Sequence, residues 1–292
     1  MDVLVVGAGL AGMGAAWRLQ GVPGVRVQVL EATDRVGGRL LSVDWEGFRF
    51  EPGARFCTTA DTALVELTHR LGLRTDIRRY VGPEVHLSVL HTKGVRAWHP
   101  IGSWRPGGWI PSWLPGLRGL VRGRRAGASD GEGDLPDESL GPWLMHRYGW
   151  STSDVSAAWL SRAMRCYGRG AWTLRGGLGR LADAMGARLR VARGVRVERV
   201  EVHRGRVRVR CECQGEHDLV EADVAVIAVP GSQVRGLLAH LPEGWAALLS
   251  HVAYSVGLPV YLVLEVQPEV NLRVGYRLLP EAAGGALAGV GI

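Results

Sequence analysis

The stretch from Asp2 to Gly12 constrains the fold more than any other part of the chain. It opens with an apolar, partly β-branched run, which is typical of a strand buried on both faces of a parallel sheet. The run ends in a Gly-x-Gly-x-x-Gly pattern made of Gly7, Gly9 and Gly12, with Leu10 and Ala11 between the last two glycines. In this pattern the first glycine permits a tight turn, the second admits a pyrophosphate, and the third lets the following helix pack closely on the sheet. The stretch therefore predicts a dinucleotide phosphate held at a helix N-terminus.

A second predicted strand, residues 25–31, ends in Glu31. An acidic residue about 20 positions beyond the last glycine is placed to accept hydrogen bonds from a ribose hydroxyl. A carboxylate there also disfavours NADP, because it would repel the 2′-phosphate. The alternative is a glycine-rich turn in an ordinary α/β domain. The strand before the turn, the helix after it and the distant acid together favour dinucleotide binding over that alternative.

A second motif follows Glu31. Ala32 is followed by Arg35-Val-Gly37-Gly38-Arg39, which resembles the paired-glycine motif of the flavin amine oxidase superfamily. That superfamily includes protoporphyrinogen oxidases and carotenoid-type desaturases. The resemblance implies that Gly37 and Gly38 pass close to FAD and that Arg39 lies near its pyrophosphate and flavin. It disfavours the alternative of a plain NAD-dependent dehydrogenase.

Three later blocks resemble the same family and follow its order along the chain. Residues 50–56 resemble an acidic-x-Gly-Ala motif, which implies that the loop with Gly53 and Ala54 lies near the flavin. Residues 174–184 resemble the stretch where the chain returns to the FAD domain. The resemblance implies that Val195 contacts the adenine through its backbone, and that residues 221–230 form a buried strand ending in proline.

The resemblance implies an α/β fold: a discontinuous Rossmann-like FAD-binding domain with an inserted α+β substrate domain. We expect the FAD-binding domain to comprise residues 1–80 and 172–235, and a partial substrate domain to comprise residues 81–171 and 236–292. Local patterns predict hairpins turning near residues 45–47 and 203–206, and helices over residues 59–73, 140–148 and 154–164.

The chain departs from the family pattern in two places. Between residues 230 and 292 we find no Gly-Asp dipeptide of the kind that binds the flavin ribityl chain and pyrophosphate. Residues 254–265, where the resemblance places a strand, lack the lysine that amine oxidases usually carry near the flavin, which favours desaturase-type or porphyrinogen-type chemistry.

Two functions follow from these features. The first is an FAD-dependent oxidoreductase that dehydrogenates an apolar or ring-bearing small molecule (a porphyrinogen, an isoprenoid or an amine-like compound) by hydride transfer to flavin. The second is a truncated, catalytically incompetent homologue that binds nucleotide or acts as a partner of a complementing subunit. No residue stands out as a catalytic acid or base, since the histidines are isolated along the chain.

Composition and charge exclude other classes. The net charge is +7, but Lys93 is the only lysine and the arginines are scattered, so we expect no nucleic-acid binding. Cys211 and Cys213 lie on the apolar face of a strand with period two, which indicates core packing and no metal site.

The tryptophans between residues 98 and 113 lie among proline, glycine and arginine. They are consistent with weak association with a membrane surface. The segment is too rich in proline and glycine for a good amphipathic helix, which favours the alternatives of a lid over the substrate or core aromatics. No apolar run reaches transmembrane length, and Asp2 stands where a signal peptide would be basic. A cytoplasmic protein acting on a small-molecule substrate is expected.

Overall fold

The computed structural model of the chain describes residues 1–80, 86–91, 94–98, 154–156, 158, 159, 162, 171–263, 275–278 and 289–291. The chain divides into two compact units. The first comprises residues 1–56, 63–78 and 173–254, and the second comprises residues 57–62, 79–172 and 255–292. The assignment of the predicted domains to cofactor and substrate stays a prediction. The predicted helix at 140–148 and most of that at 154–164 lie outside the described residues.

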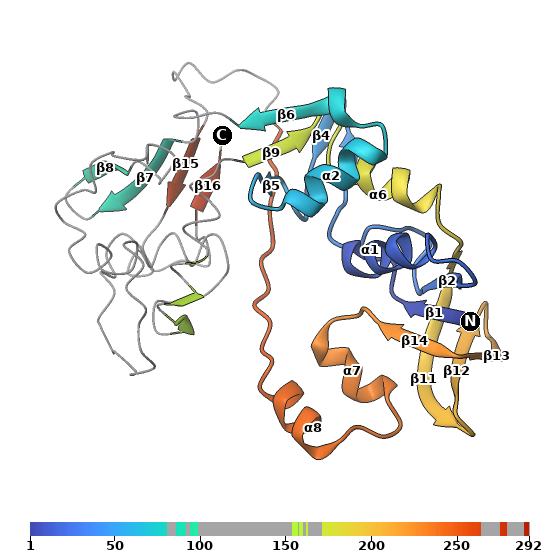
Figure 1. The fold of residues 1–292 in the computed structure, drawn as a ribbon. Helices are drawn as coiled ribbons and strands as arrows, with labels where there is room; N and C mark the ends of the chain where they lie inside the picture. Colours follow the sequence, from blue (N-terminus) through green and yellow to red (C-terminus); the bar gives the residue numbers. More distant parts are fainter. Residues whose placement is uncertain are drawn as a thin grey trace. The chain divides into compact units, whose positions relative to one another are not determined.

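A four-stranded parallel sheet forms the centre of the first unit (Figure 1). Its strands, in spatial order, are β10 (Val191–Arg193), β2 (Arg26–Glu31), β1 (Asp2–Val6) and β14 (Val224–Ile227). The chain passes from β1 to β2 through helix α1 (Leu10–Leu19), as the glycine pattern predicts. Parallel strands joined through a helix are the unit of a Rossmann-like fold, so the predicted α/β class is confirmed.

Helices cover one face of this sheet. Met13 and Ala16 of α1 are fully buried, and α1 contacts α6 (Gly179–Gly186), whose Leu181 and Met185 are also fully buried. The alternation along β1 gives the sheet a second apolar face, which carries Leu4 and Val6.

That second face is covered by a three-stranded antiparallel sheet. Its strands are β11 (Val195–His203), β12 (Arg206–Cys213) and β13 (Glu216–Ala222). The first two strands turn at Arg204 and Gly205, as predicted, and both turn residues have positive φ, 51° and 78°. The core between the two sheets contains Leu4, Val6, Leu30, Val197, Val200, Val209 and Ala222.

The remaining described elements of the first unit are short. They are the predicted hairpin β3 (Val43–Trp45) and β4 (Phe48–Phe50), helix α2 (Thr62–Arg70), the 3-10 helix η1 (Arg74–Asp76), and helices α7 (Gly231–Leu237) and α8 (Glu243–Ser250). The hairpin confirms the turn predicted near residue 46. Helix α2 confirms the helix predicted over residues 59–73, although it is shorter at both ends.

The second unit contains a mixed sheet. Its order is β16 (Gly289–Gly291), β15 (Gly275–Leu278), β7 (His86–His91) and β8 (Gly94–Trp98). A further three-stranded sheet, whose strands include residues assigned to either unit, has the order β5 (Cys57–Thr58), β9 (Ala171–Leu174) and β6 (Ile77–Tyr80). Among the helices that the structure describes, none is both long and apolar enough to cross a membrane.

Two predicted strands differ from the structure. Residues 221–230 were expected to form one buried strand, but Glu221 and Ala222 end β13, and only 224–227 join the parallel sheet. Asp223 separates the two elements by accepting a hydrogen bond from the Asp2 backbone N–H, 2.7 Å, and β14 is left half-buried at the sheet edge. The described part of the other predicted strand, residues 254–263, is in no strand; Val256 there is 93% exposed.

The cysteines allow a direct test of this packing. Cys57 and Cys211 are buried, whereas Cys213 is half-buried, and burial raises the pKa of the Cys57 thiol to about 12. Because the thiolate is the reactive species, we expect a maleimide at neutral pH to modify Cys213 before Cys57 and Cys211. Peptide mass mapping over time measures this order. The unfolded chain, where the three sites should react alike, is the control, and early labelling of native Cys57 would contradict the described packing.

Candidate cofactor-binding site

The first glycine loop lies between β1 and α1. Gly7 has φ of 100°, and a Cβ there would approach the carbonyl oxygen of Ala228 to 3.0 Å. A Cβ on Gly12 would overlap the carbonyl oxygen of Gly7, so helix and loop touch through backbone alone. Apart from its two chain neighbours, no atom of the described residues lies within 4 Å of the position that a Cβ on Gly9 would take. The backbone at Gly7 and Gly12 is therefore packed tightly against the protein, whereas the space beside Gly9 is free for a ligand.

The open side of this loop is the N-terminus of α1. Gly9 is the N-cap in extended conformation, and no side chain among the described residues caps the helix. Leu10, Ala11 and Gly12 form its first turn, where backbone N–H groups have no partner within the helix. Such a turn attracts an anion through these N–H groups and the helix dipole.

The structure brings the second glycine loop against the first. Gly37 forms an isolated parallel bridge with Gly9, and its N–H donates to the carbonyl of Ala8 over 2.8 Å. Gly37 and Gly38 both have positive φ, 101° and 56°, and a Cβ on Gly38 would lie 3.3 Å from Gly9 Cα. These two motifs, about 25 residues apart in sequence, form one continuous backbone surface.

Glu31 lies at the end of β2 and holds both neighbouring segments. Its Oε2 accepts a hydrogen bond from the Ala8 N–H, 2.8 Å, and its Oε1 accepts from the Thr33 N–H and hydroxyl, 3.0 and 2.8 Å. A carboxylate has about four lone-pair sites, so acceptor capacity for a ribose hydroxyl is left. The sequence indicated only the ribose role; the bond to Ala8 needed the folded chain.

The other predicted residues lie around these two loops. The Ala54 N–H donates to the Arg39 carbonyl, 2.9 Å, and a Cβ on Gly53 would overlap that same carbonyl. Arg39 is exposed, and within the described part of the chain its guanidinium has no hydrogen bond or ion pair. An exposed guanidinium of this kind is suited to pair with a diphosphate.

Val195 and Ala32 lie near Glu31. Strand β10 pairs with β2 so that Arg193 stands opposite Glu31, and the next residue, Gly194, donates its N–H to the Thr33 carbonyl over 2.9 Å. Val195 follows at the start of β11, and Ala32 follows Glu31 on the exposed side. The predicted adenine-side residue is therefore near the predicted ribose-side residue.

Sequence reasoning missed a half-buried polar cluster beside these loops. Glu51 Oε1 accepts hydrogen bonds from the Ser42 hydroxyl, 2.6 Å, and from the Leu178 N–H, 3.2 Å. The Ser42 hydroxyl in turn accepts from the Gly179 N–H, 2.9 Å. Burial raises the pKa of Glu51, and its hydrogen bonds with Ser42 and Leu178 act in the opposite direction. The only sequence signal for this cluster was the acidic residue of the block at 50–56.

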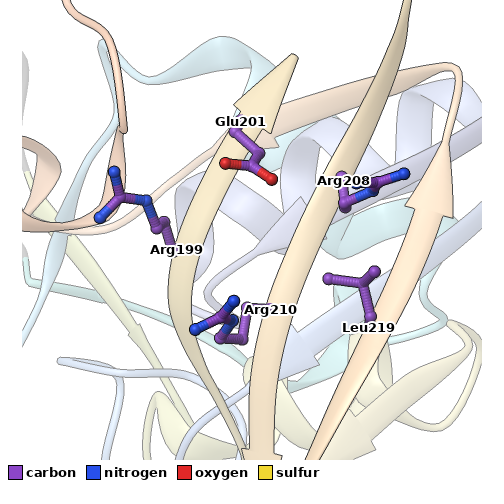
Figure 2. Close-up of a pocket in the computed structure, with 5 residues that line it drawn as sticks. All are labelled: Arg199, Glu201, Arg208, Arg210 and Leu219. Carbon is purple, nitrogen blue, oxygen red and sulfur yellow. The ribbon is translucent and has the colours of Figure 1, made fainter. Parts of the chain in front are cut away.

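A pocket of about 280 Å³ lies elsewhere, on the outer face of β11, β12 and β13 (Figure 2). Its lining is Arg199, Glu201, Arg208, Arg210 and Leu219. None of these side chains belongs to the glycine loops, so the pocket and the candidate site are separate. No group of metal-ligating side chains is close enough to hold a metal ion among the described residues.

Parts of the chain are similar in sequence to known proteins. The sequence profile of flavin-containing amine oxidoreductases matches residues 10–121 and 137–275. Over 87 residues the chain is 45% identical to putrescine oxidase of Kocuria rosea, covering 30% of this chain and 18% of that protein. Over 72 residues it is 44% identical to protoporphyrinogen oxidase 2 of Arabidopsis thaliana, covering 25% and 14%. The chain thus matches less than a fifth of the length of either relative.

The fold has solved counterparts. The structure of cyclohexylamine oxidase from Brevibacterium oxydans superposes with a TM-score of 0.68 at 22% identity, over 85% of this chain and 62% of that one. At this identity the similarity establishes the fold, and it supports the Rossmann-like class expected from the sequence.

Proposed function

The chain belongs to the family of flavin-containing amine oxidoreductases, and on this basis we propose that it acts as an FAD-dependent oxidoreductase on a small organic molecule. One observation of the structure carries the proposal. The two glycine loops meet at the N-terminus of α1, with Gly37 bridged to Gly9, and Glu31 anchors the first of them. This surface has the shape and donor groups that a dinucleotide pyrophosphate needs.

The residues present fit FAD, and each has a distinct proposed role. The N–H groups of Leu10, Ala11 and Gly12 would bind the pyrophosphate, and Glu31 would accept from a ribose hydroxyl. Arg39 would supply positive charge beside the diphosphate, and the backbones of Gly37, Gly38, Gly53 and Ala54 would approach the cofactor without side-chain obstruction. Val195 and Ala32 would flank the adenine side. When bound, FAD supplies the two-electron acceptor, and the chain binds and orients it.

We propose an apolar or ring-bearing small molecule as substrate. Its supports are the family and the relatives, whose names include both amine oxidases and a protoporphyrinogen oxidase. Residues 254–265 contain no lysine, and this favours porphyrinogen-type over amine chemistry. That preference stays a prediction. The same holds for a cytoplasmic location, for weak membrane-surface association and for a complementing subunit.

The visible spectrum of the purified chain, before and after addition of FAD, tests the proposal. We expect flavin absorption bands that stay with the protein through gel filtration. Amines, porphyrinogens and isoprenoids would then be screened for turnover, which separates the substrate classes. A protein that carries no flavin absorption through gel filtration after incubation with excess FAD would contradict the proposal and support a catalytically incompetent homologue.

A further inference from the structure

We propose that Glu51 is a positioning residue that holds the second glycine loop, Gly37–Arg39, in its cofactor-binding conformation. This inference rests on the proposed function, since that loop is the one assigned to FAD. Glu51 does not act on the loop through one contact. It ties together three segments of the first unit: residues 39–42, residues 51–54 and the start of α6.

The first tie runs from Glu51 to Ser42. The Ser42 hydroxyl donates to Glu51 Oε1 over 2.6 Å and accepts from the Gly179 N–H over 2.9 Å. Ser42 comes three residues after Arg39, so this pair of bonds fixes the chain just beyond the loop. A half-buried hydroxyl that both donates and accepts holds a single rotamer and leaves little freedom to its backbone.

The second tie runs from Glu51 to the start of α6. Oε1 also accepts from the Leu178 N–H, 3.2 Å. A Cβ on Gly177 would overlap both Glu51 Oε1 and Ser42 Oγ, and Gly177 has φ of 86°. The close approach of backbone to carboxyl therefore requires glycine at this position. Ala182 lies further along α6, and a Cβ on Gly37 would come within 2.6 Å of the Ala182 Cβ. Helix α6 therefore also packs directly on the glycine loop.

The third tie returns to Arg39 along the chain after Glu51. The Ala54 N–H donates to the Arg39 carbonyl over 2.9 Å. Gly53 is so close to that carbonyl that a Cβ on it would overlap the oxygen. Glu51 is thus joined to the loop from one side through Ser42 and from the other through residues 53 and 54. Loss of its carboxyl oxygen would leave the Ser42 hydroxyl and the Leu178 N–H without their acceptor, and both ends of the loop would loosen.

Glu51→Ala and Glu51→Gln test this role against Val209→Ala as the matched control. Glutamine keeps an acceptor oxygen for Ser42 and Leu178, whereas alanine removes it. Val209 is fully buried in β12, so its truncation destabilises the same unit by a cavity and touches none of the three segments. Three quantities are measured for each variant. They are the affinity for FAD by titration, the stability by urea unfolding, and the exchange rates of the Ala54 and Gly179 amides in the FAD-free chain.

We expect Glu51→Ala to weaken FAD binding about tenfold or more and to speed exchange of both amides, with Glu51→Gln within about threefold of the wild type. Val209→Ala should lose stability and keep its FAD affinity. The proposal is overturned if Glu51→Ala keeps wild-type affinity, or if Val209→Ala loses as much affinity at equal stability. It is also overturned if neither amide responds to Glu51→Ala. A wild-type chain that binds no FAD would instead refute the proposed function. The amide exchange would still test the role of Glu51 in that case, because it is measured in the FAD-free chain.

Discussion

Replacing Gly12 with alanine is expected to abolish FAD binding and to lower the free energy of unfolding by about 1–3 kcal/mol. The added Cβ would overlap the carbonyl oxygen of Gly7 and lie 3.2 Å from the Ala228 Cβ. Gly7 has little room to move away, because a Cβ built on it would lie only 3.0 Å from the Ala228 carbonyl oxygen. Helix α1 must therefore move away from β1, and the N–H groups of its first turn lose their common direction. FAD titration and urea unfolding followed by circular dichroism measure the two effects.

Gly14→Ala is the matched control for this substitution. Gly14 lies two residues further along α1. Apart from its chain neighbours and the backbone of α1, no atom of the described part of the chain lies within 4 Å of the position that its Cβ would take. Alanine favours a helix interior over glycine by about 0.5–1 kcal/mol, so this variant should be more stable and bind FAD as the wild type does. Equal losses in the two variants would mean that α1 tolerates no change at all. Normal FAD binding by Gly12→Ala would show that the close contact at Gly7 is not needed.

The local part of the candidate site was predictable because its signals lie within a few residues of each other. Strand β1, the turn at Gly7 and helix α1 follow from one glycine pattern and the change of apolar period after it. The hairpin turn at Glu46 and Gly47 is similar: both residues have positive φ, 51° and 78°, and glycine in a short polar turn between apolar runs predicts it.

The parts that could not be predicted depend on contacts between distant segments. Strand β10 has only three residues, too few to show a period, and its place beside β2 comes from parallel pairing with residues more than 150 positions earlier in the chain. Glu51 meets Ser42 nine residues away and Leu178 127 residues away, and no spacing rule links these positions. Residues 224–227 have the composition of a buried strand, but within the described residues no strand pairs with their outer edge, which leaves them half-buried.

Replacing Glu31 with alanine is expected to lower FAD affinity by about a hundredfold and to destabilise the first unit by about 1–3 kcal/mol. The reason is that one carboxylate serves two purposes. It accepts from the N–H of Ala8, which is fully buried, and that donor would be left without a partner in the variant. It is also the proposed acceptor for the ribose, so ligand contact and loop anchor are lost together.

Two variants separate these roles. Thr33→Ala keeps the Glu31 carboxylate but removes the hydroxyl that donates to Glu31 Oε1, 2.8 Å, and to the Arg35 carbonyl, 3.0 Å, so it should cost some stability but little FAD affinity. Glu66→Ala removes an exposed carboxylate that pairs with Arg70 on α2, and should change neither quantity by more than about 0.5 kcal/mol. FAD titration and urea unfolding of all three variants give the comparison. If Glu31→Ala loses stability but binds FAD normally, the carboxylate serves only to anchor Ala8 and Thr33, and the ribose assignment falls. If the loss of FAD affinity is larger than the loss of stability can explain, the ribose lies at Glu31. The reason is that a contact with the ligand contributes to binding but not to the folding of the free chain.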